Sequence, residues 1–283
     1  MKGKHIAITG PTAGIGRTTS LELARQGAQL TLLCRSPEKA ELLQREIVSA
    51  GGLMPDIVIM DMASLESVRT AGEALAAKGR PLDVLLNNAG IINMSRQETV
   101  DGFEETLAVN HFAPFLLTGL LLPLLQKSPA ARIVNVASDA HNFVKGMGFE
   151  DMQATSSYKT FREYGRSKLA NILFTRRLAQ HLQGQNITVN CLHPGAVSTS
   201  LGTQNNGLIG KILPLLLKPF FKSPQQGAQT SIYLCTSEHV ASTTGEYFVD
   251  CNLRKTKPWA RDEAAGDRLW RDTEEALNYI FPI

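Results

Sequence analysis

A tyrosine four residues before a lysine is the feature of this chain with the clearest chemical potential. If the segment is helical, Tyr164 and Lys168 share one face, so the phenol and the ammonium can converge on one point. A free phenol has a pKa of about 10, and a nearby cation favours the phenolate. Such a pair can serve as a general acid and base. Taken alone the pattern is weak, because a solvated helix face holding both residues is the commoner arrangement.

A glycine-rich turn near the N-terminus indicates a phosphate site. An apolar run at 5–9 predicts a buried strand, and an amphipathic run at 17–26 predicts a helix that stops at Gly27. A turn between a strand and a helix presents backbone N–H groups and the positive end of a helix dipole to a pyrophosphate. The residues of this turn that we expect to bind a cofactor are Gly10, Thr12, Gly14, Ile15 and Gly16. Their spacing differs from G-x-G-x-x-G, and such a run is often only a turn.

The residue after the second predicted strand indicates which dinucleotide binds. This strand covers 29–34 and is followed by Arg35, where enzymes that use NAD tend to carry an acidic residue for the ribose hydroxyl. The planar guanidinium suits a 2′-phosphate, and Lys39 lies about one helical turn further on. We therefore expect NADP(H). The alternative is an ordinary surface arginine at a strand end.

The composition limits the classes of function. The 283 residues are 43% hydrophobic, as in a globular protein with a sizeable core. A net charge of +3 without a long basic run argues against a nucleic-acid partner. The four cysteines have no zinc spacing, so we expect no metal site and reduced thiols. The first residues do not have the pattern of a signal peptide, and we expect a cytoplasmic location.

Two apolar segments raise the question of a membrane. The segment 107–126 has no formal charge, but two prolines and several polar residues interrupt it. A helix buried in a layered domain, or at a subunit interface, explains it better. The segment 208–221 is too short to span a bilayer. It fits either a substrate lid, within a loop region of about 197–223, or an amphipathic patch in peripheral contact with a membrane.

Strand-like and helix-like runs alternate along the whole chain. The strand-like runs lie at 5–9, 29–34, 56–60, 83–86, 132–137, 188–192 and 247–249. Alternation of this kind predicts an α/β fold, a doubly wound parallel sheet with helices on both faces. With no repeat or linker, we expect a single domain over 1–283. Ligands of such sheets bind beyond the carboxyl ends of the strands, where Asp61, Asn88 and Ser138 follow apolar runs.

In chain order, these motifs resemble the short-chain dehydrogenase/reductase family over essentially the whole chain. The residues that carry the resemblance are Thr9-Gly-x-x-x-Gly-Ile-Gly16, Asn87-Asn-Ala-Gly90, Asn110, Ser138 and Tyr164-x-x-x-Lys168. The chain is more closely similar to the retinol dehydrogenase-like group. That match rests on Asp101-Gly-Phe-Glu104, Val109-Asn-His111, the sequence from Tyr164 to Thr175, and the long interval between Ser138 and Tyr164.

The resemblance implies a catalytic role for four residues. Tyr164 would act as general acid in carbonyl reduction and as general base in alcohol oxidation. Lys168 would lower the pKa of Tyr164 and bind the nicotinamide ribose, and Ser138 would bind the substrate oxygen as a hydrogen-bond donor. Asn110 would support a proton relay. The alternative for Asn110 is a buried helical asparagine that satisfies a neighbouring backbone group.

The resemblance also implies further cofactor contacts. Asp61 and Met62 would frame the adenine, Asn88, Ala89 and Gly90 would line the adenosine side, and Pro194, Gly195, Val197 and Thr199 would hold the carboxamide. There are departures from the family pattern. Glu163 stands where many relatives have a small residue before the tyrosine, and Ala113-Pro114 replaces a common Gly-His pair.

We therefore expect an NADP(H)-dependent oxidoreductase that interconverts a lipophilic aldehyde or ketone and its alcohol, of the retinal, steroid or long-chain type. The alternative from another class is a non-catalytic NADP(H)-binding sensor or scaffold on the same fold, and a membrane-surface interaction protein is a more distant one. The resemblance further implies a homo-oligomer, a dimer or tetramer, paired through the helices that hold 107–126 and 164–182.

Overall fold

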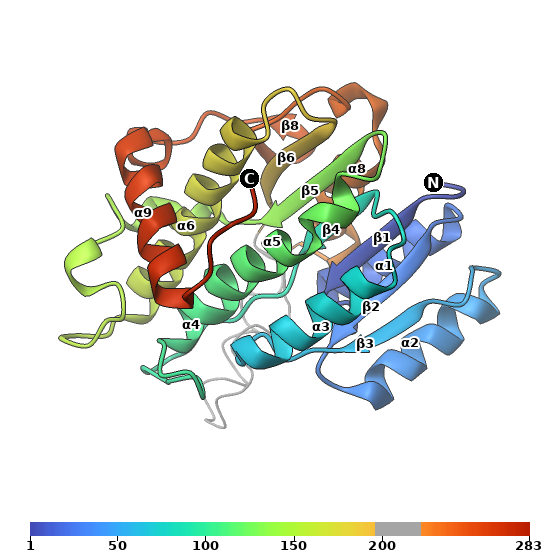
Figure 1. Ribbon diagram of the computed structural model, residues 1–283, viewed down its shortest axis with the longest axis horizontal. Helices are drawn as coiled ribbons and strands as arrows, with labels where there is room; N and C mark the ends of the chain where they lie inside the picture. The colour runs from blue at the N-terminus through green and yellow to red at the C-terminus, as the bar shows by residue number, and fades with distance from the viewer. Residues whose placement is uncertain (196–221) are drawn as a thin grey trace.

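The computed structural model describes residues 1–195 and 222–283, and a twisted sheet runs through its centre with helices on both faces (Figure 1). The described strands are β1 (His5–Thr9), β2 (Gln29–Cys34), β3 (Asp56–Ile59), β4 (Val84–Asn87), β5 (Ala131–Val136), β6 (Ile187–His193), β7 (Tyr247–Val249) and β8 (Asn252–Leu253). They lie in the order β3-β2-β1-β4-β5-β6-β7-β8. All neighbours are parallel except β7 and β8. The predicted fold class is confirmed.

The seven predicted strands are all present, and each lies within about a residue of its predicted ends. The central strands β1, β2 and β4 are buried along almost their whole length, as parallel strands covered by helices on both faces are. The antiparallel strand β8 was not predicted. It pairs with β7 through a tight turn at Asp250 and Cys251, whose φ angles are 51° and 60°. A two-residue strand has no periodicity to detect, and positive φ angles are unusual outside glycine.

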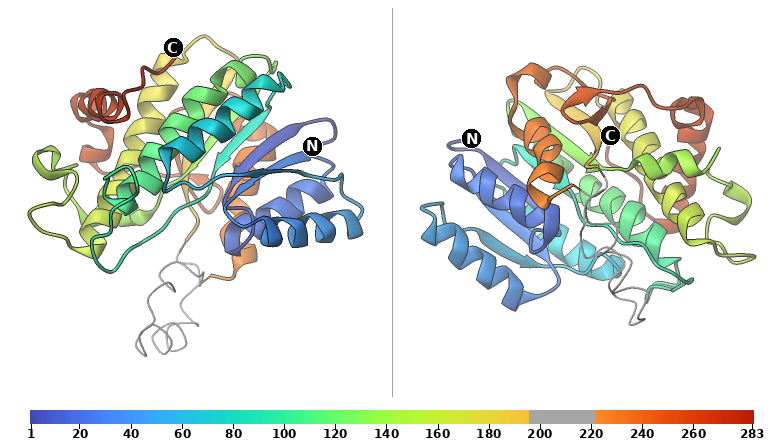
Figure 2. Two further views of the ribbon diagram at one scale, coloured as in Figure 1. Left: turned by 60° about the horizontal axis from the view of Figure 1, so that its bottom comes forward. Right: turned by 180° about the vertical axis from the view of Figure 1, so that it is seen from behind.

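The helices form two layers. They are α1 (Gly14–Arg25), α2 (Pro37–Ser49), α3 (Leu65–Ala77), α4 (Glu105–Leu107), α5 (Ala113–Leu125), α6 (Thr160–His181), α8 (Pro224–Thr236) and α9 (Glu263–Leu277). One apolar core lies between the sheet and α1, α2 and α8, and a second lies between the sheet and α3, α5 and α6 (Figure 2). The expected start of the first helix at residue 17 was wrong, because its first turn includes Gly14 and Gly16.

The apolar segment 107–126 is a core helix, as one of its two interpretations expected. It runs from α4 through a π-helical segment (Ala108–Phe112) into α5, and 89% of its most apolar window is buried. On length and composition this helix could cross a membrane, but its burial against the sheet explains the same composition. It is the one such helix in the parts of the chain that the structure describes.

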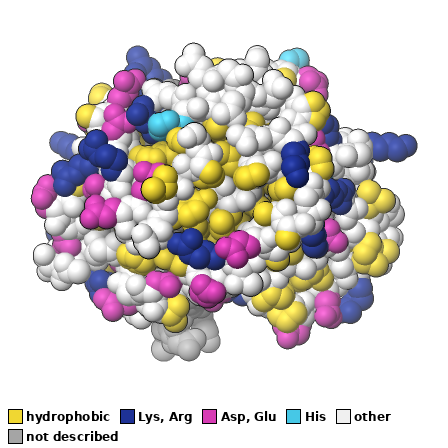
Figure 3. Space-filling model, viewed as in Figure 1, with side chains coloured by type: hydrophobic (Ala, Val, Ile, Leu, Met, Phe, Trp, Pro, Cys, Tyr) yellow, Lys and Arg dark blue, Asp and Glu magenta, His cyan; other side chains and the backbone are white. Residues whose placement is uncertain are grey.

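Helix α9 and the tail after it cover the outer side of α5 and α6. Trp270 and Phe281 pack on Phe115 with ring centroids 5.0 Å away, and Phe174 completes the cluster. Part of the face that was expected to pair two subunits is therefore buried within the chain. Hydrophobic side chains still gather on the surface over α5 and the tail (Figure 3), and Ile280 in the tail is 85% exposed.

Candidate active site

A cavity of about 340 Å³ lies at the carboxyl ends of the parallel strands. It gathers nearly all the predicted site residues that the structure describes: Gly10, Thr12, Gly14, Ile15, Gly16, Arg35, Asp61, Met62, Asn88, Ala89, Gly90, Ser138, Tyr164, Lys168, Pro194 and Gly195. Asn110 is the exception and does not line it. Val197, Thr199, the segment 208–221 and almost all of the expected lid at 197–223 lie outside the described residues.

The glycine-rich loop forms a narrow cradle at one wall of the cavity. Gly10 and Gly14 have φ angles of 63° and 50°, which favour glycine. A Cβ on Gly16 would lie 2.1 Å from the carbonyl oxygen of Gly10, so no side chain fits there. The N-cap of α1 is Ala13, which has no side-chain acceptor for the first N–H groups of the helix. These groups fit the pyrophosphate of a dinucleotide.

Thr9, which opens the first motif but was not predicted as a site residue, ties this loop to the segment after β4. Its hydroxyl oxygen accepts hydrogen bonds from the backbone N–H groups of Asn88 (3.0 Å) and Ala89 (2.9 Å). The amide nitrogen of Asn88 donates to the carbonyl oxygens of Thr9 and Gly10. The side chain of Asn88 therefore stabilises the glycine-rich loop through these hydrogen bonds, and the residue also lines the cavity. The signal in the sequence was a hydroxyl residue directly before the first glycine.

Two cations mark the far end of the cavity. Arg35 and Lys39 both line it, and both are exposed. Neither takes part in an ion pair with the described residues, whereas Arg17 nearby is paired with Glu46 at 2.5 Å. The hydroxyl of Ser36 accepts from the N–H of Lys39 and so caps α2 at this point. The end of β2 thus presents uncompensated positive charge to the cavity.

Ser138 and Tyr164 meet at the opposite end. The Oγ of Ser138 accepts from the backbone N–H of Ala140 at 3.1 Å, which leaves its proton for donation. Burial raises the pKa of Tyr164, and the hydroxyl of the neighbouring Ser138 offsets this rise only in part. Among the protein's own groups desolvation is the larger effect, and the lowering expected from Lys168 together with a cofactor cation stays a prediction.

Lys168 is buried beside Tyr164. Its Nζ donates to the carbonyl oxygen of Val136 at 3.0 Å and lies 5.6 Å from the centroid of the Tyr164 ring. Burial lowers the pKa of Lys168 to about 8. An ammonium with such a pKa can exchange its proton near neutral pH, which a free lysine cannot.

Asn110 is fully buried, and its amide binds protein groups. The Oδ1 accepts from the N–H of Ile91 at 2.8 Å, and the Nδ2 donates to the carbonyl of Ile91 and to the hydroxyl of Ser167, both at 2.9 Å. This geometry matches the structural alternative for Asn110. A Cβ on Gly90 would lie 3.1 Å from its Oδ1 and 3.2 Å from the Nζ of Lys168. Asn110 therefore fixes the loop that passes over the lysine.

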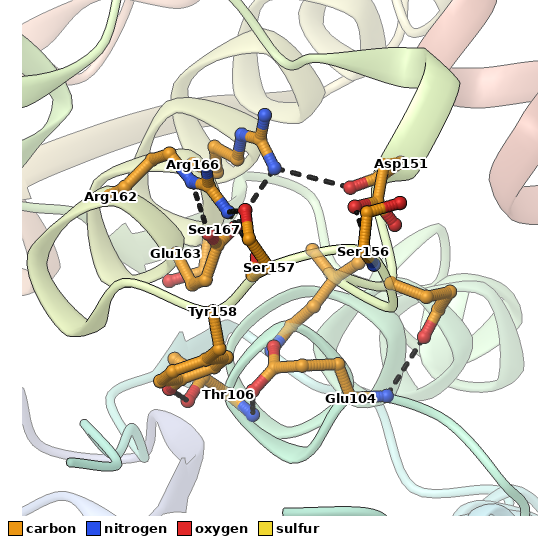
Figure 4. A network of polar contacts seen from close by, with 12 residues as sticks. Glu104, Thr106, Asp151, Ser156, Ser157, Tyr158, Arg162, Glu163, Arg166 and Ser167 are labelled. Atoms are coloured by element: carbon orange, nitrogen blue, oxygen red, sulfur yellow. Dashed lines mark hydrogen bonds and ion pairs between the residues drawn. The ribbon is translucent and has the colours of Figure 1, made fainter. Parts of the chain in front are cut away.

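Glu163, the unusual neighbour of the tyrosine, pairs with two arginines of the same helix. Its buried carboxylate pairs with Arg162 and, at 3.0 Å, with Arg166 (Figure 4). Arg166 also donates to the carbonyl of Asp151 at 3.1 Å, in the long interval before Tyr164. The carboxylate does not contribute to the pKa shift of Tyr164. Its function in the fold is to anchor this interval to α6.

The cavity also has walls that the sequence analysis missed. These further lining residues include Ala13, Leu33, Cys34, Met60, Ala63, Ile91, Ile92, Asn93, Glu105, Val109, Val136 and Ala137. Most are apolar and directly follow or precede a recognised motif, which was the available signal. Asn93 and Glu105 are polar, and the amide of Asn93 donates to the carboxylate at 2.6 Å. No spacing rule connects these two, since they meet only through the fold.

Comparison with known proteins places the chain among dehydrogenases. Residues 4–207 match the family model described as short chain dehydrogenase. Retinol dehydrogenase 14 of Mus musculus is 44% identical over 99% of this chain and 87% of its own length. A crystal structure from Mycobacterium paratuberculosis is 29% identical, with a TM-score of 0.79, and covers 100% of this chain and 96% of its own. A structure from Beutenbergia cavernae with bound NADP, described as a candidate NAD(P)-dependent gluconate 5-dehydrogenase, is 27% identical with a TM-score of 0.72, covering 88% and 96%.

Proposed function

The chain belongs to the short-chain dehydrogenase family, and on that premise we propose that it interconverts a lipophilic aldehyde or ketone and its alcohol with NADP(H). The observation that carries the proposal is the convergence of Ser138, Tyr164 and Lys168 at one end of a cavity whose other end carries Arg35. Membership of the family makes the protein an oxidoreductase. The cofactor, the residues that act and the substrate class are the proposed parts.

In the proposed mechanism, Tyr164 exchanges a proton with the substrate oxygen. Its raised pKa keeps the phenol protonated at neutral pH, which suits the general acid of carbonyl reduction. Ser138 donates a second hydrogen bond to the same oxygen, because the bond its Oγ accepts from the N–H of Ala140 orients the hydroxyl and leaves its proton free. Two fixed donors stabilise the negative charge that develops on the oxygen.

Lys168 supports the proton exchange of Tyr164. Its Nζ lies on the ring side of Tyr164, and its pKa of about 8 allows it to return a proton to the phenolate after each reduction. A nicotinamide dinucleotide held in this cavity would supply or accept the hydride. The cradle at Gly10, Gly14 and Gly16 fits its pyrophosphate.

The preference for NADP(H) is supported by the charge at the end of β2. Arg35 and Lys39 are exposed to the cavity and lack acidic partners among the described residues. A 2′-phosphate would give each a charge-assisted hydrogen bond. The Beutenbergia cavernae neighbour, which holds NADP, is consistent with this choice.

The lipophilic substrate class rests on two observations. The relatives named retinol dehydrogenase, from Mus musculus and Homo sapiens, act by their names on an apolar alcohol. The cavity wall formed by Ile91, Ile92 and Val109 offers apolar contact. As an oxidoreductase of this kind, the protein would take substrates whose reacting carbonyl is attached to a ring or a long chain.

The test follows NADPH oxidation with a panel of carbonyls from short hydrophilic ones to retinal, steroids and long-chain aldehydes, with Tyr164→Phe beside the native protein. We expect turnover of the lipophilic members, and its loss in the variant with NADPH binding retained. Faster turnover of the small hydrophilic carbonyls would refute the substrate class. NADPH binding without turnover of any carbonyl would favour the sensor or scaffold instead.

A further inference from the structure

The carboxylate of Asp139, the residue after the proposed catalytic serine, lies close to side chains from two neighbouring strands. Asp139 follows Ser138, just beyond β5, and its Oδ1 accepts a hydrogen bond of 2.7 Å from the hydroxyl of Tyr247 in β7. Its Oδ2 lies 3.5 Å from the Nε2 of His193, the last residue of β6. The three side chains come from positions more than fifty residues apart and meet only in the fold. None of them lines the cavity.

The buried hydroxyl of Tyr247 needs a hydrogen-bond acceptor, and Asp139 is that acceptor. Tyr247 is 4% exposed, and its burial and the neighbouring carboxylate raise its pKa, so the hydroxyl stays protonated and requires an acceptor. Asp139 supplies that acceptor while its side chain remains 54% exposed. The carboxylate therefore stays hydrated on its outer side, and the contact avoids the large desolvation penalty of a fully buried ion.

This contact fixes a segment that bears directly on the chemistry. Ser138 takes its own orientation from the N–H of Ala140, on the other side of Asp139. His193 comes directly before Pro194 and Gly195, which line the cavity. Asp139, hydrogen-bonded to Tyr247 and 3.5 Å from His193, therefore lies between the segment of Ser138 and the residue that leads into Pro194 and Gly195.

A second contact, made by His141, fixes the backbone carbonyl of Ser138. The Nδ1 of His141 lies 2.7 Å from the carbonyl oxygen of Ser138, and its ring packs edge-on against Tyr247 at 5.3 Å. Charged groups around the cluster are Lys257, which faces His141, and Lys222 and Asp250, which face His193. Lys222 and Asp250 pair with each other. Both residues that hold the Ser138 segment, Asp139 and His141, are thus in contact with the buried Tyr247.

We propose that Asp139 is a positioning residue, anchored by Tyr247, that holds Ser138 in register with the Pro194–Gly195 wall. The proposal rests on the function proposed above, since it assigns to Asp139 an effect on the step in which Ser138 takes part. Asp139 acts through Ser138 and does not touch the substrate. Loss of the anchor should lower kcat by a larger factor than it raises the KM for NADPH, because the cradle at the other end of the cavity is intact.

The experiment compares Asp139→Ala, Asp139→Asn and Tyr247→Phe with the native full-length protein. We expect about a tenfold loss of kcat for the alanine and phenylalanine variants, and about a threefold loss or less for the asparagine variant, whose amide oxygen still accepts from Tyr247. The double variant Asp139→Ala/Tyr247→Phe should be no worse than Asp139→Ala alone, because the phenylalanine removes only a contact that the alanine has already removed. Tyr279→Phe, which removes a hydroxyl near Gly119, is the matched control and should be unchanged.

A second measurement does not depend on turnover. Hydrogen–deuterium exchange of the peptide covering 138–143 should be faster in Asp139→Ala and Tyr247→Phe, since the segment is no longer anchored and the bond from the N–H of Ala140 to Ser138 opens more often. Unchanged exchange, or losses of kcat that add in the double variant, would overturn the positioning role. If the native protein turns over no carbonyl, the proposed function fails, and the exchange rates alone decide whether Asp139 holds the segment.

Discussion

The ammonium of Lys168 donates its hydrogen bond to the backbone carbonyl of Val136, the last residue of β5, at 3.0 Å. The carbonyl is also within 3.3 Å of the amide nitrogen of Asn171, so it does not depend on the lysine for a partner. The lysine is buried, and its pKa falls from the usual 10.5 to about 8 because the charged form is desolvated. The native fold therefore carries a charge that it would be more stable without.

We expect Lys168→Met to abolish turnover and to stabilise the protein. At pH 7 the lysine is charged in both folded and unfolded chains, so the whole penalty is present, and removing it should add about 3 kcal/mol to the free energy of unfolding. As pH rises from about 8 to about 10.5 the folded lysine becomes neutral first, and the advantage of methionine should shrink. Urea unfolding at pH 7 and pH 10 measures both. An equal or lower stability of the variant at pH 7 would contradict the account.

The cradle of the glycine-rich loop gives a second prediction. Gly16→Ala places a Cβ 2.1 Å from the carbonyl oxygen of Gly10, so the loop must open and the phosphate-binding N–H groups must move. We expect NADPH binding to weaken by at least about tenfold, measured by fluorescence titration. Gly266→Ala, in α9, is the matched control, because the Cβ that alanine adds there would have no neighbouring atom within 4 Å. The control should bind NADPH normally and gain about 0.5–1 kcal/mol in stability. Normal binding by Gly16→Ala would contradict the cradle.

Cofactor choice depends on Arg35. Replacing it by aspartate removes a charge-assisted contact with a 2′-phosphate and adds repulsion, so we expect kcat/KM with NADPH to fall by about 10- to 100-fold relative to NADH. The change should weaken at high salt, because Arg35 is exposed. Arg45→Asp makes the same charge change on the exterior of α2, where Arg45 lies near Glu41. That control should keep the native ratio. An unchanged ratio in Arg35→Asp would mean that the arginine does not select the cofactor.

The fold was largely predictable because the buried strands are continuous apolar runs and the chain alternates them with amphipathic ones. The cavity was predictable for a related reason, since the carboxyl ends of parallel strands meet at one edge and the motifs follow those ends. Thus Gly10, Asn88 and Ser138, far apart in the sequence, line one cavity. The short antiparallel strand β8 could not be predicted in this way, because a strand of two residues has no periodicity.

The physical state of individual side chains was harder to predict. Whether Asn110 faced a proton relay or the backbone of Ile91 depends on a π-helical turn that no local pattern signals. The direction of the Tyr164 pKa shift depends on burial, which outweighs the effect of the neighbouring Ser138 hydroxyl. The contact between Asp139 and Tyr247 joins positions 108 residues apart. Such relationships require the coordinates of both partners.

A last prediction concerns acid stability and His111. This imidazole is buried against Phe112, Phe115 and Phe174, with its Nε2 3.0 Å from the hydroxyl of Thr273. Burial lowers its pKa to about 3 from the usual 6.5. Between these values the unfolded chain binds the proton and the folded one does not, so stability falls as pH decreases through this range.

We expect His111 to lower the free energy of unfolding by about 2–3 kcal/mol between pH 7 and pH 4.5. In His111→Gln that part of the pH dependence should disappear, because glutamine does not titrate and its amide can still reach Thr273. His239→Gln, at an exposed site, is the control and should keep the native slope, since its ring meets water in both states. Equal slopes in all three proteins would show that His111 is not desolvated as the aromatic cluster requires, and that water reaches it through the packing of α9.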